Sequence, residues 1–209
     1  MTALLPEKDK RLDYKIILNL VNENSRILDL GCGDGTLLDL LNKEKNVIGR
    51  GVEISTEGVH LSMEKGLSVV QGNIDEGLSD YEDKSFDWVI LSQTLQVIRE
   101  PLLVILEMLR VGKHVIVSFP NSGHWKFRFN LLLKGRMPKT KLLPFEWYNT
   151  PNIRSLTIKD FKDFIYLEKM RVVKEYYFKD YSKLSKFRPA NFFASMAMYV
   201  IEGMDNFPL

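Results

Sequence analysis

The sequence predicts an α/β fold: a mostly parallel, seven-stranded sheet with helices on both faces and a C-terminal antiparallel hairpin. Two observations lead to this prediction. Short apolar runs alternate with helical patterns up to residue 119, and this alternation is typical of parallel sheets whose strands are linked by helices. The first strand also leads straight into a glycine-rich turn within residues 27–36, followed by a helical pattern.

A lead-in helix is expected over residues 12–21, where Leu12, Ile16, Ile17 and Leu20 recur at helical spacing. The elements after it follow from the same criteria. In chain order they are strand 25–30, helix 35–44, strand 47–54, helix 56–65, strand 68–71, a turn-rich loop, strand 86–91, helix 100–110 and strand 113–119.

The alternation stops after Phe119. Residues 120–156 contain four prolines, an aromatic and basic stretch and little strand pattern, so we expect a functional insertion after the fifth strand. No repeat or second domain boundary is visible, and residues 1–209 are expected to form one domain. The last elements are helix 157–169, with Thr157 as its N-cap, and strands 171–178 and 191–201, which a basic loop joins into a hairpin at the sheet edge.

Composition restricts the class of protein and its surroundings. A chain of 209 residues with 45% hydrophobic residues can build a substantial core, and a net charge of +2 gives no field that would recruit nucleic acid. The one cysteine, Cys32, excludes an internal disulfide and fits a reducing cytosol. Residues 192–201, the longest apolar stretch, are too short to span a bilayer. We expect a cytoplasmic protein with no membrane or nucleic-acid partner, and with no metal site because its histidines are dispersed.

The turn within residues 27–36 is the most informative part of the chain. Gly31, Gly33 and Gly35 allow a tight bend in which a ligand can lie against bare backbone, and the next helix offers free N–H groups. Asp29 indicates the ligand, because a carboxylate repels a pyrophosphate but attracts the ammonium and sulfonium of S-adenosylmethionine (SAM). The glycines alone are weak support, since such turns also serve as plain strand–helix connectors.

Three further strand ends favour a SAM pocket. Glu53 lies near the end of the second strand, 22 residues beyond Gly31. A carboxylate that binds a ribose diol is expected at an offset of about 20 residues. Asn73 follows the third strand, where the adenine would lie, and Ser92 ends the fourth, where small polar groups suit the methionine end. The ends of parallel strands meet at one edge of the sheet, so one cleft can collect these side chains and Asp29.

Seven segments carry a family resemblance: 29–37 (DLGCGDGTL), 51–54 (GVEI), 71–78 (QGNIDEGL), 89–96 (VILSQTLQ), 117–125 (VSFPNSGHW), 135–138 (GRMP) and 147–153 (WYNTPNI). On these residues the chain resembles the Rossmann-like, class I SAM-dependent methyltransferases, and within them the methionine biosynthesis protein W (MetW) family. The resemblance covers about residues 24–178. It implies SAM as cofactor, a link to methionine biosynthesis and homoserine O-acyltransferase as a partner.

The resemblance also implies roles for individual residues. Asp29 would orient the ammonium of SAM, and Glu53 would accept hydrogen bonds from both ribose hydroxyls. Position 73 is Asn where many relatives have Asp, but its amide carbonyl can still accept a hydrogen bond from adenine. For Ile54 and Ile74, which would sandwich the adenine, core packing is the alternative. The remaining residues of the implied SAM site are Gly31, Cys32, Gly33, Ser92 and Gln93.

Methyl transfer depends mainly on positioning, so the protein need not supply a nucleophile, and a base is needed only for an acceptor that loses a proton. The candidates for that base are His124 and Tyr148, both in the expected insertion, and a structural hydrogen bond is the alternative for each. A role for Cys32 as nucleophile is disfavoured.

A basic stretch lies within the expected insertion, with no acidic residue from Ser122 to Phe145. The basic residues are Lys126, Arg128, Lys134, Arg136, Lys139 and Lys141. The stretch has four interpretations: a solvated face, a binding surface for an anionic substrate or an acidic partner, a membrane-binding surface, or a nucleic-acid-binding surface. The first two are favoured.

Two functions remain open for the protein as a whole. One is transfer of a methyl group to a small acceptor, including one unrelated to methionine. The other is a SAM-sensing partner of homoserine O-acyltransferase.

Overall fold

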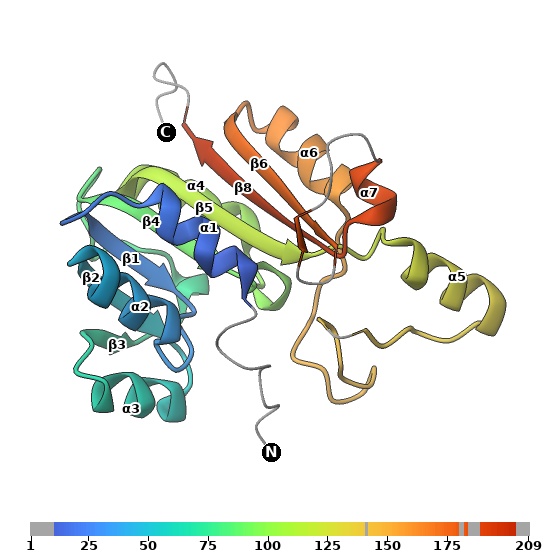
Figure 1. Ribbon diagram of the computed structural model, residues 1–209, viewed down its shortest axis with the longest axis horizontal. Coiled ribbons are helices and arrows are strands. Elements are labelled where there is room, and N and C mark those ends of the chain that lie inside the picture. Colours follow the sequence, from blue (N-terminus) through green and yellow to red (C-terminus); the bar gives the residue numbers. More distant parts are fainter. Residues whose placement is uncertain (1–10, 141, 180–181, 184–188, 204–209) are drawn as a thin grey trace.

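The structure of the protein is a computed structural model, which describes residues 11–140, 142–179, 182–183 and 189–203. Its centre is an eight-stranded sheet with the order β3-β2-β1-β4-β5-β8-β6-β7 (Figure 1). The strands are β1 (Arg26–Leu30), β2 (Ile48–Glu53), β3 (Val69–Gln71), β4 (Phe86–Ser92), β5 (Gly112–Pro120), β6 (Arg171–Lys179), β7 (Ser182–Lys183) and β8 (Met196–Glu202).

The pairing of the strands confirms the predicted fold class. Strands β1 to β5 pair in parallel, and β8 pairs antiparallel with both β5 and β6. The two-residue strand β7 is an addition to the seven predicted strands, and it pairs antiparallel with the end of β6. The expected basic loop of the hairpin falls largely outside the described residues.

Helices cover both faces of the sheet (Figure 1). They are α1 (Leu12–Leu20), α2 (Thr36–Lys45), α3 (Thr56–Glu64), α4 (Pro101–Val111), α5 (Trp125–Lys134), α6 (Ile158–Leu167) and α7 (Ala190–Phe193), with short 3-10 turns at Ile74–Glu76 and Leu95–Val97. None of the helices in the described ranges has the length and hydropathy that crossing a bilayer requires.

Two hydrophobic cores form because successive side chains of a strand point to opposite faces. On one face, Ile27 of β1 packs with residues of α1 and α2, such as Ile17 and Leu38. On the other face, Leu28 packs with residues of α4 and α6, such as Met108. The alternation within β1 therefore places a helix layer on each side of the sheet. The predicted N-cap of α6 is confirmed: Thr157 and Asp160 form a reciprocal capping box.

The prediction that residues 191–201 form one strand was wrong at its N-terminal end. The short helix α7 occupies Ala190–Phe193, and β8 begins only at Met196. The side chain of Asn121 explains the difference, because its Nδ2 donates to the carbonyls of Ala194 (2.7 Å) and Asn191 (3.1 Å). These carbonyls are thereby satisfied without a neighbouring strand.

Residues 121–156, here called the arm, leave the sheet after β5 and project beside the C-terminal ends of the strands (Figure 1). The arm contains α5, a helix that the sequence analysis did not anticipate. Its C-terminal part returns to the body, where the N–H groups of Ile153 and Arg154 both donate to the carbonyl of Gln96 at 3.0 Å. The organisation of the chain as one domain with an insertion stays a prediction.

Candidate functional site

A cleft of about 250 Å³ opens at the carboxyl ends of β1, β2 and β4. Six of the residues proposed from the sequence line it, and the loops after β3 and β4 complete its walls. The lining residues are Gly31, Val52, Glu53, Ile54, Gly72, Asn73, Ile74, Asp75, Gln93, Thr94, Val97 and Ile98. Parallel strands thus converge on one edge, as the sequence predicted.

The glycine turn has a conformation that side chains would not allow. Gly31 has φ +67°, and a Cβ at this position would lie 2.6 Å from Cγ2 of Thr94. Gly33 also has a left-handed φ of +58°, with open space where its Cβ would project. The N–H of Gly31 donates to the carbonyl of Val52 at 2.8 Å, which fixes the turn against the end of β2. The result is bare backbone at the base of the cleft.

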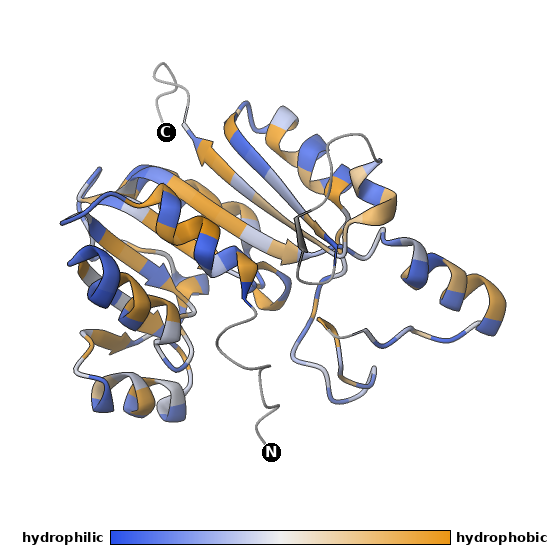
Figure 2. Cartoon of the chain, in the orientation of Figure 1, coloured by the Kyte–Doolittle hydropathy of each residue, from blue (hydrophilic) through white to orange (hydrophobic). Residues whose placement is uncertain are grey.

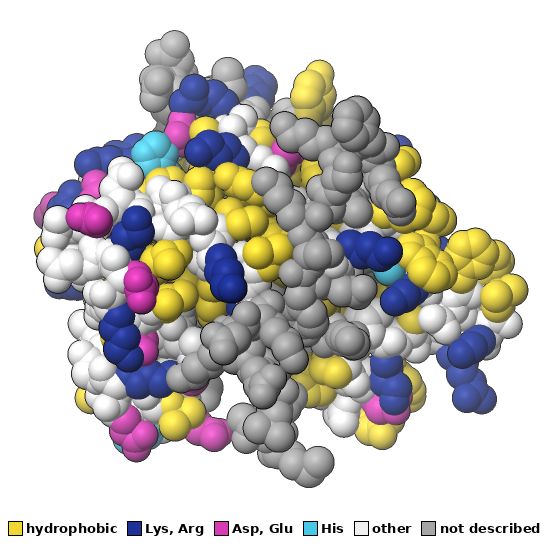
Figure 3. Space-filling view, viewed as in Figure 1, with side chains coloured by type: hydrophobic (Ala, Val, Ile, Leu, Met, Phe, Trp, Pro, Cys, Tyr) yellow, Lys and Arg dark blue, Asp and Glu magenta, His cyan; other side chains and the backbone are white. Residues whose placement is uncertain are grey.

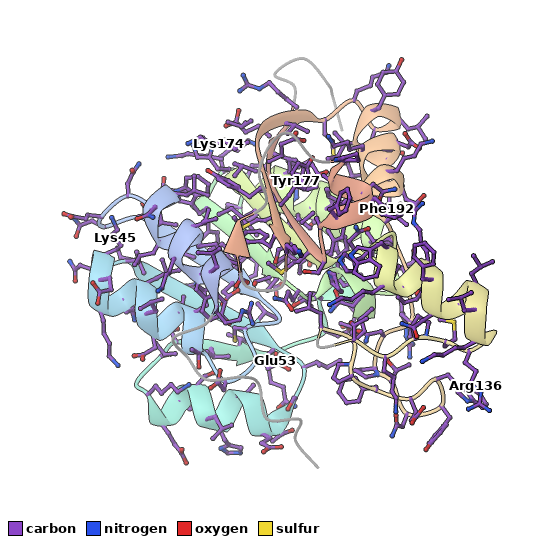
Figure 4. The ribbon with its side chains drawn as sticks, turned by 45° about the vertical axis from the view of Figure 1, so that its right-hand side comes forward. Lys45, Glu53, Arg136, Lys174, Tyr177 and Phe192 are labelled. Atoms are coloured by element: carbon purple, nitrogen blue, oxygen red, sulfur yellow. The ribbon has the colours of Figure 1, made fainter. Side chains whose placement is uncertain are left out.

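Glu53 joins this turn to the next helix. Its Oε2 accepts a hydrogen bond from the N–H of Gly33 and its Oε1 accepts one from the N–H of Ser55, each at 2.8 Å. Ser55 in turn caps α3, since its hydroxyl accepts from the N–H of Gly58. The carboxylate lies at the end of β2 on the side of the sheet that faces the arm (Figure 4). It is therefore a fixed negative group in the wall of the cleft.

Asp29 is a second carboxyl group at this edge, at the end of β1 and 2% exposed. Burial raises its pKa to about 7, the guanidinium of Arg11 opposes that rise, and the negative charge of Glu53 adds to it. A carboxyl group with a pKa near neutrality responds strongly to a nearby cation, which would stabilise its ionised form.

Arg11 is a site residue that the sequence analysis missed. Its Nη2 donates to Oγ of Ser92 at 3.1 Å, and its Nε donates to Oδ1 of Asp13 at 2.9 Å. Its guanidinium carbon also lies 4.1 Å from the centroid of the Tyr14 ring. The feature of the sequence that could have pointed to Arg11 is Asp13, an acidic residue within the apolar pattern of α1. Asp13 is 2% exposed in the structure.

The proposed adenine side of the cleft separates into exposed and packed residues. Ile54 is 65% exposed, so core packing does not explain it. Ile74 packs partly against the core cluster of the α4 face. Asn73 caps the following 3-10 turn, where its Oδ1 accepts from the N–H of Asp75 at 3.1 Å. Asn73 is thus held at the rim by its own turn.

Gln93 and Thr94 form the wall opposite Glu53. Gln93 has φ +55°, unusual for a residue with a side chain, and its Nε2 lies 3.2 Å from Sδ of Met196. Thr94, not singled out from the sequence, packs against Gly31 across the base of the cleft. Ser92 does not line the cleft, because its hydroxyl is engaged with Arg11.

Cys32 lies beneath the turn rather than in the cleft. Burial, followed by the negative charges of Asp29 and Glu53, raises the pKa of its thiol to about 12. Its sulfur occupies the space beside Gly51, where an added Cβ would be only 2.7 Å away. The thiol is therefore protonated at neutral pH and packs as a small apolar group.

The two candidate bases do not line the cleft. His124 is buried at the start of α5, where its Nδ1 accepts from the N–H of Lys126 at 3.4 Å. It contributes to a separate cavity of about 280 Å³ that also contains Asn121 and Lys139. Tyr148 is 69% exposed and packs edge-on against Trp147. Catalytic roles for His124 and Tyr148 stay predictions.

Three features together define the SAM-dependent methyltransferase fold. They are a parallel sheet with helices on both faces, a C-terminal antiparallel hairpin, and a glycine turn beside an acidic residue at the end of β2. Solved structures with the same fold support this assignment. A SAM-dependent methyltransferase from Archaeoglobus fulgidus has a TM-score of 0.65 at 17% identity, covering 91% of each chain. The plantazolicin methyltransferase BpumL, in complex with a monoazolic desmethylPZN analog and SAH, has a TM-score of 0.62 at 15% identity, covering 93% of this chain and 81% of that one.

The family model for "Methionine biosynthesis protein MetW" matches residues 11–201, and the chain belongs to this family. A relative from Rhodopirellula baltica, named bifunctional methionine biosynthesis protein MetXA/MetW, is 36% identical over 163 residues. The match covers 74% of this chain but 26% of that protein, so the chain spans about a quarter of its relative. The [4+2]-cyclase SpnF also shares the fold, with a TM-score of 0.66, 14% identity and coverage of 93% of this chain and 81% of that one. The fold by itself therefore does not determine the reaction.

Proposed function

We propose that the cleft binds SAM and that the chain transfers the methyl group of SAM to a small acceptor. The observation that carries this proposal is the Glu53 carboxylate in the wall of the cleft, with the buried carboxyl group of Asp29 at the end of the neighbouring strand, beside the bare glycine turn. A ligand with a cationic amino-acid end and an uncharged nucleoside end is complementary to them. A pyrophosphate would place like charges close together.

The residues of the cleft fit the separate parts of SAM. Glu53 presents a carboxylate to the ribose hydroxyls, and the exposed Ile54 offers an apolar surface to the adenine. Asp29 would hold the ammonium, and Gly33 leaves space beside the turn for the methionine chain.

The bound cofactor supplies a methyl group on a sulfonium that needs no further activation. The protein contributes alignment of donor and acceptor and exclusion of water. The arm, which projects beside the cleft, is the element available to position an acceptor (Figure 1). A base is needed only for an acceptor that loses a proton, and His124 and Tyr148 remain the candidates in the arm.

Isothermal titration calorimetry tests the pocket directly. SAM and its demethylated product should both give heat with 1:1 stoichiometry, while NAD, with its pyrophosphate, should give none. Absence of heat with both SAM and the product would contradict the proposal, and tight binding of NAD would replace it. A radiolabelled methyl-transfer assay with candidate acceptors then separates turnover from binding alone.

A second candidate function is regulation of a homoserine O-acyltransferase by direct contact, with SAM as the sensed end product of the pathway. The observation that favours it is the Rhodopirellula baltica relative, whose name joins MetXA and MetW in one protein. Fusion keeps two parts at a high effective concentration, which favours direct contact between them.

The attachment of the arm supports this second candidate. Arg154 donates through Nε to the carbonyl of Ile98 at 3.0 Å and through Nη2 to the carbonyl of Arg99, and Ile98 lines the cleft. Ligand binding at the cleft and partner binding at the arm would thus act on one loop. If SAM changes the affinity for the acyltransferase, the acyltransferase must change the affinity for SAM by the same factor. Measuring the acyltransferase affinity with and without SAM tests this, and equal values would contradict regulation by SAM.

A further inference from the structure

We propose that one face of α5 is a docking surface for a patch of mixed acidic and apolar side chains on a protein partner. This inference rests on the second candidate function, in which that partner is a homoserine O-acyltransferase. It goes further by assigning the contact to particular residues, which we call the α5 stripe: Trp125, Phe129, Leu132 and Leu133.

The stripe has the spacing of a helix face that is normally buried. Its members recur at i, i+4, i+7 and i+8, and such a pattern usually packs on a core. Here the helix buries none of its residues: Phe129 is 46% exposed, and Leu132 and Leu133 are each 77% exposed. The last turn of the helix is hydrophobic (Figure 2), and hydrophobic side chains gather over the projecting end of the molecule (Figure 3).

Residues of α5 outside the stripe hold the helix to the rest of the protein. Phe127 lines the cavities between α5 and the later part of the arm. Arg128 donates through Nε to the carbonyl of Gly123 at 2.6 Å, and its guanidinium carbon lies 5.6 Å from the centroid of the Phe192 ring. At the C-terminal end, Gly135 with φ +57° ends the helix. Phe129, Leu132 and Leu133 of the stripe remain exposed, whereas Trp125 at its start is half-buried.

The surroundings of the stripe define the chemistry of its occupant. Lys126, Lys134 and Arg136 are exposed beside it, and no acidic residue occurs from Ser122 to Phe145. Arg136 lies at the far end of the arm, well separated from Lys174 on β6 (Figure 4). A complementary partner therefore offers carboxylates around an apolar spot.

This charge pattern disfavours other occupants. A second copy docked symmetrically through the stripe would bring the same cations face to face. Nucleic acid would pair with the cations but would leave the exposed leucines without apolar partners. The acyltransferase is the partner for which the fused relative supplies an independent argument.

The experiment measures binding of purified homoserine O-acyltransferase from the same cell to the full chain by biolayer interferometry. Leu133→Asp should weaken binding about tenfold or more, because it places a charge in the apolar centre of the contact. The double variant Lys134→Glu/Arg136→Glu should slow association and reduce its sensitivity to salt. The matched controls are Leu167→Asp, at a leucine 71% exposed on α6, and Lys174→Glu. Both should bind within about twofold of the wild type.

The outcomes separate this inference from the proposed function. Equal binding by wild type and Leu133→Asp would overturn the docking surface and leave the partnership intact. No binding by the wild type would overturn both, while the SAM titration would still report on the cleft. Binding of the wild type, but not Leu133→Asp, to vesicles of anionic phospholipid would assign the stripe to a membrane and overturn the inference. Concentration-dependent dimerisation lost in Leu133→Asp would assign it to a second copy.

Discussion

The glycine-turn cleft and the arm lie next to each other but differ in how their side chains are satisfied. In the cleft, both oxygens of Glu53 already accept backbone hydrogen bonds, and the turn is fixed to β2 through Gly31. In the arm, Leu132 and Leu133 are each 77% exposed. The first region is complete before a ligand arrives, whereas the second exposes the kind of surface that proteins normally cover.

This difference separates two kinds of binding site. A site for a small ligand must be preorganised, because ordering it during binding would reduce affinity. A site for a protein partner can leave its apolar side chains in water, since the partner covers them. Substitutions in the cleft should therefore affect both SAM affinity and stability, and substitutions in the α5 stripe should affect neither. The five predictions below follow this contrast.

The largest effect on affinity is expected for Glu53→Ala. Loss of the carboxylate removes the charge-assisted hydrogen bonds to the ribose and frees the N–H of Gly33, so SAM affinity should fall about 100-fold or more. Titration calorimetry measures this change. The control is Glu57→Ala, at an exposed acidic residue in the first turn of α3, and an equal loss in that variant would contradict the assignment.

The largest effect on stability is expected for Gly31→Ala. The new Cβ would lie 2.6 Å from Cγ2 of Thr94 and would also hold alanine at φ +67°. We expect a loss of about 2–4 kcal/mol in the free energy of unfolding, measured by denaturant titration. Gly66→Ala is the matched control, since Gly66 has φ +76° but no atom within 4 Å of a Cβ. It should lose about 1 kcal/mol, the strain alone.

A pH effect is expected from Asp29, whose pKa is raised to about 7 chiefly by burial. Protonation below that pKa removes the charge that attracts the ammonium, so SAM affinity should increase about tenfold between about pH 6 and 8. Asp29→Asn should bind more weakly and lose this dependence, which calorimetry at several pH values measures. An equally steep profile in the variant would assign the titration to another group.

The stability of the ligand-free protein should change in the opposite direction. Because the pKa of Asp29 is higher in the folded than in the unfolded chain, the folded state binds the proton more tightly, and the contribution of Asp29 falls as pH rises from about 4 to 7. Asp29→Asn should therefore gain stability relative to the wild type over this pH range. Its melting temperature measured across the range provides the check.

The smallest effect is expected for Arg154→Ala. This change removes the side-chain hydrogen bonds to the carbonyls of Ile98 and Arg99 and loosens the arm from the wall of the cleft. SAM affinity should fall about threefold, as expected for indirect coupling of about 0.5–2 kcal/mol. Arg136→Ala, at the far end of the arm, should leave SAM affinity unchanged. A decrease in Arg136→Ala would show that the two regions are not independent.

Much of the fold was predictable because its signals are local. Each parallel strand is a short apolar run, and the capping box of Thr157 and Asp160 involves residues only three positions apart in the sequence. The glycine turn and Glu53 were also predictable, because the bend requires residues without side chains and the spacing to the next strand end is nearly constant. The helix α5 was missed although its stripe has helical spacing, since the prolines nearby and the interleaved aromatic and basic residues suggested an irregular segment.

The contacts of the site depended on distant parts of the chain. Arg11 reaches Ser92 across 81 positions because α1 packs on the face of the sheet that contains Ile27 and Ile90. Asp13 indicates a nearby cation, but nothing in the sequence around Arg11 indicates the contact with Ser92. In the same way, the burial of His124 and the exposure of Tyr148 follow from the path of the arm rather than from the residues beside them.

The sequence by itself determined which segments form the parallel strands, the glycine bend and the carboxylates at the strand ends, because each depends on backbone conformation and on spacing along a few residues. Only the tertiary structure decided that Asp29 is buried next to Arg11 and that the face of α5 remains uncovered. Burial and exposure depend on which distant segments pack together, and this packing sets both the pKa of a carboxyl group and the surface left for a partner.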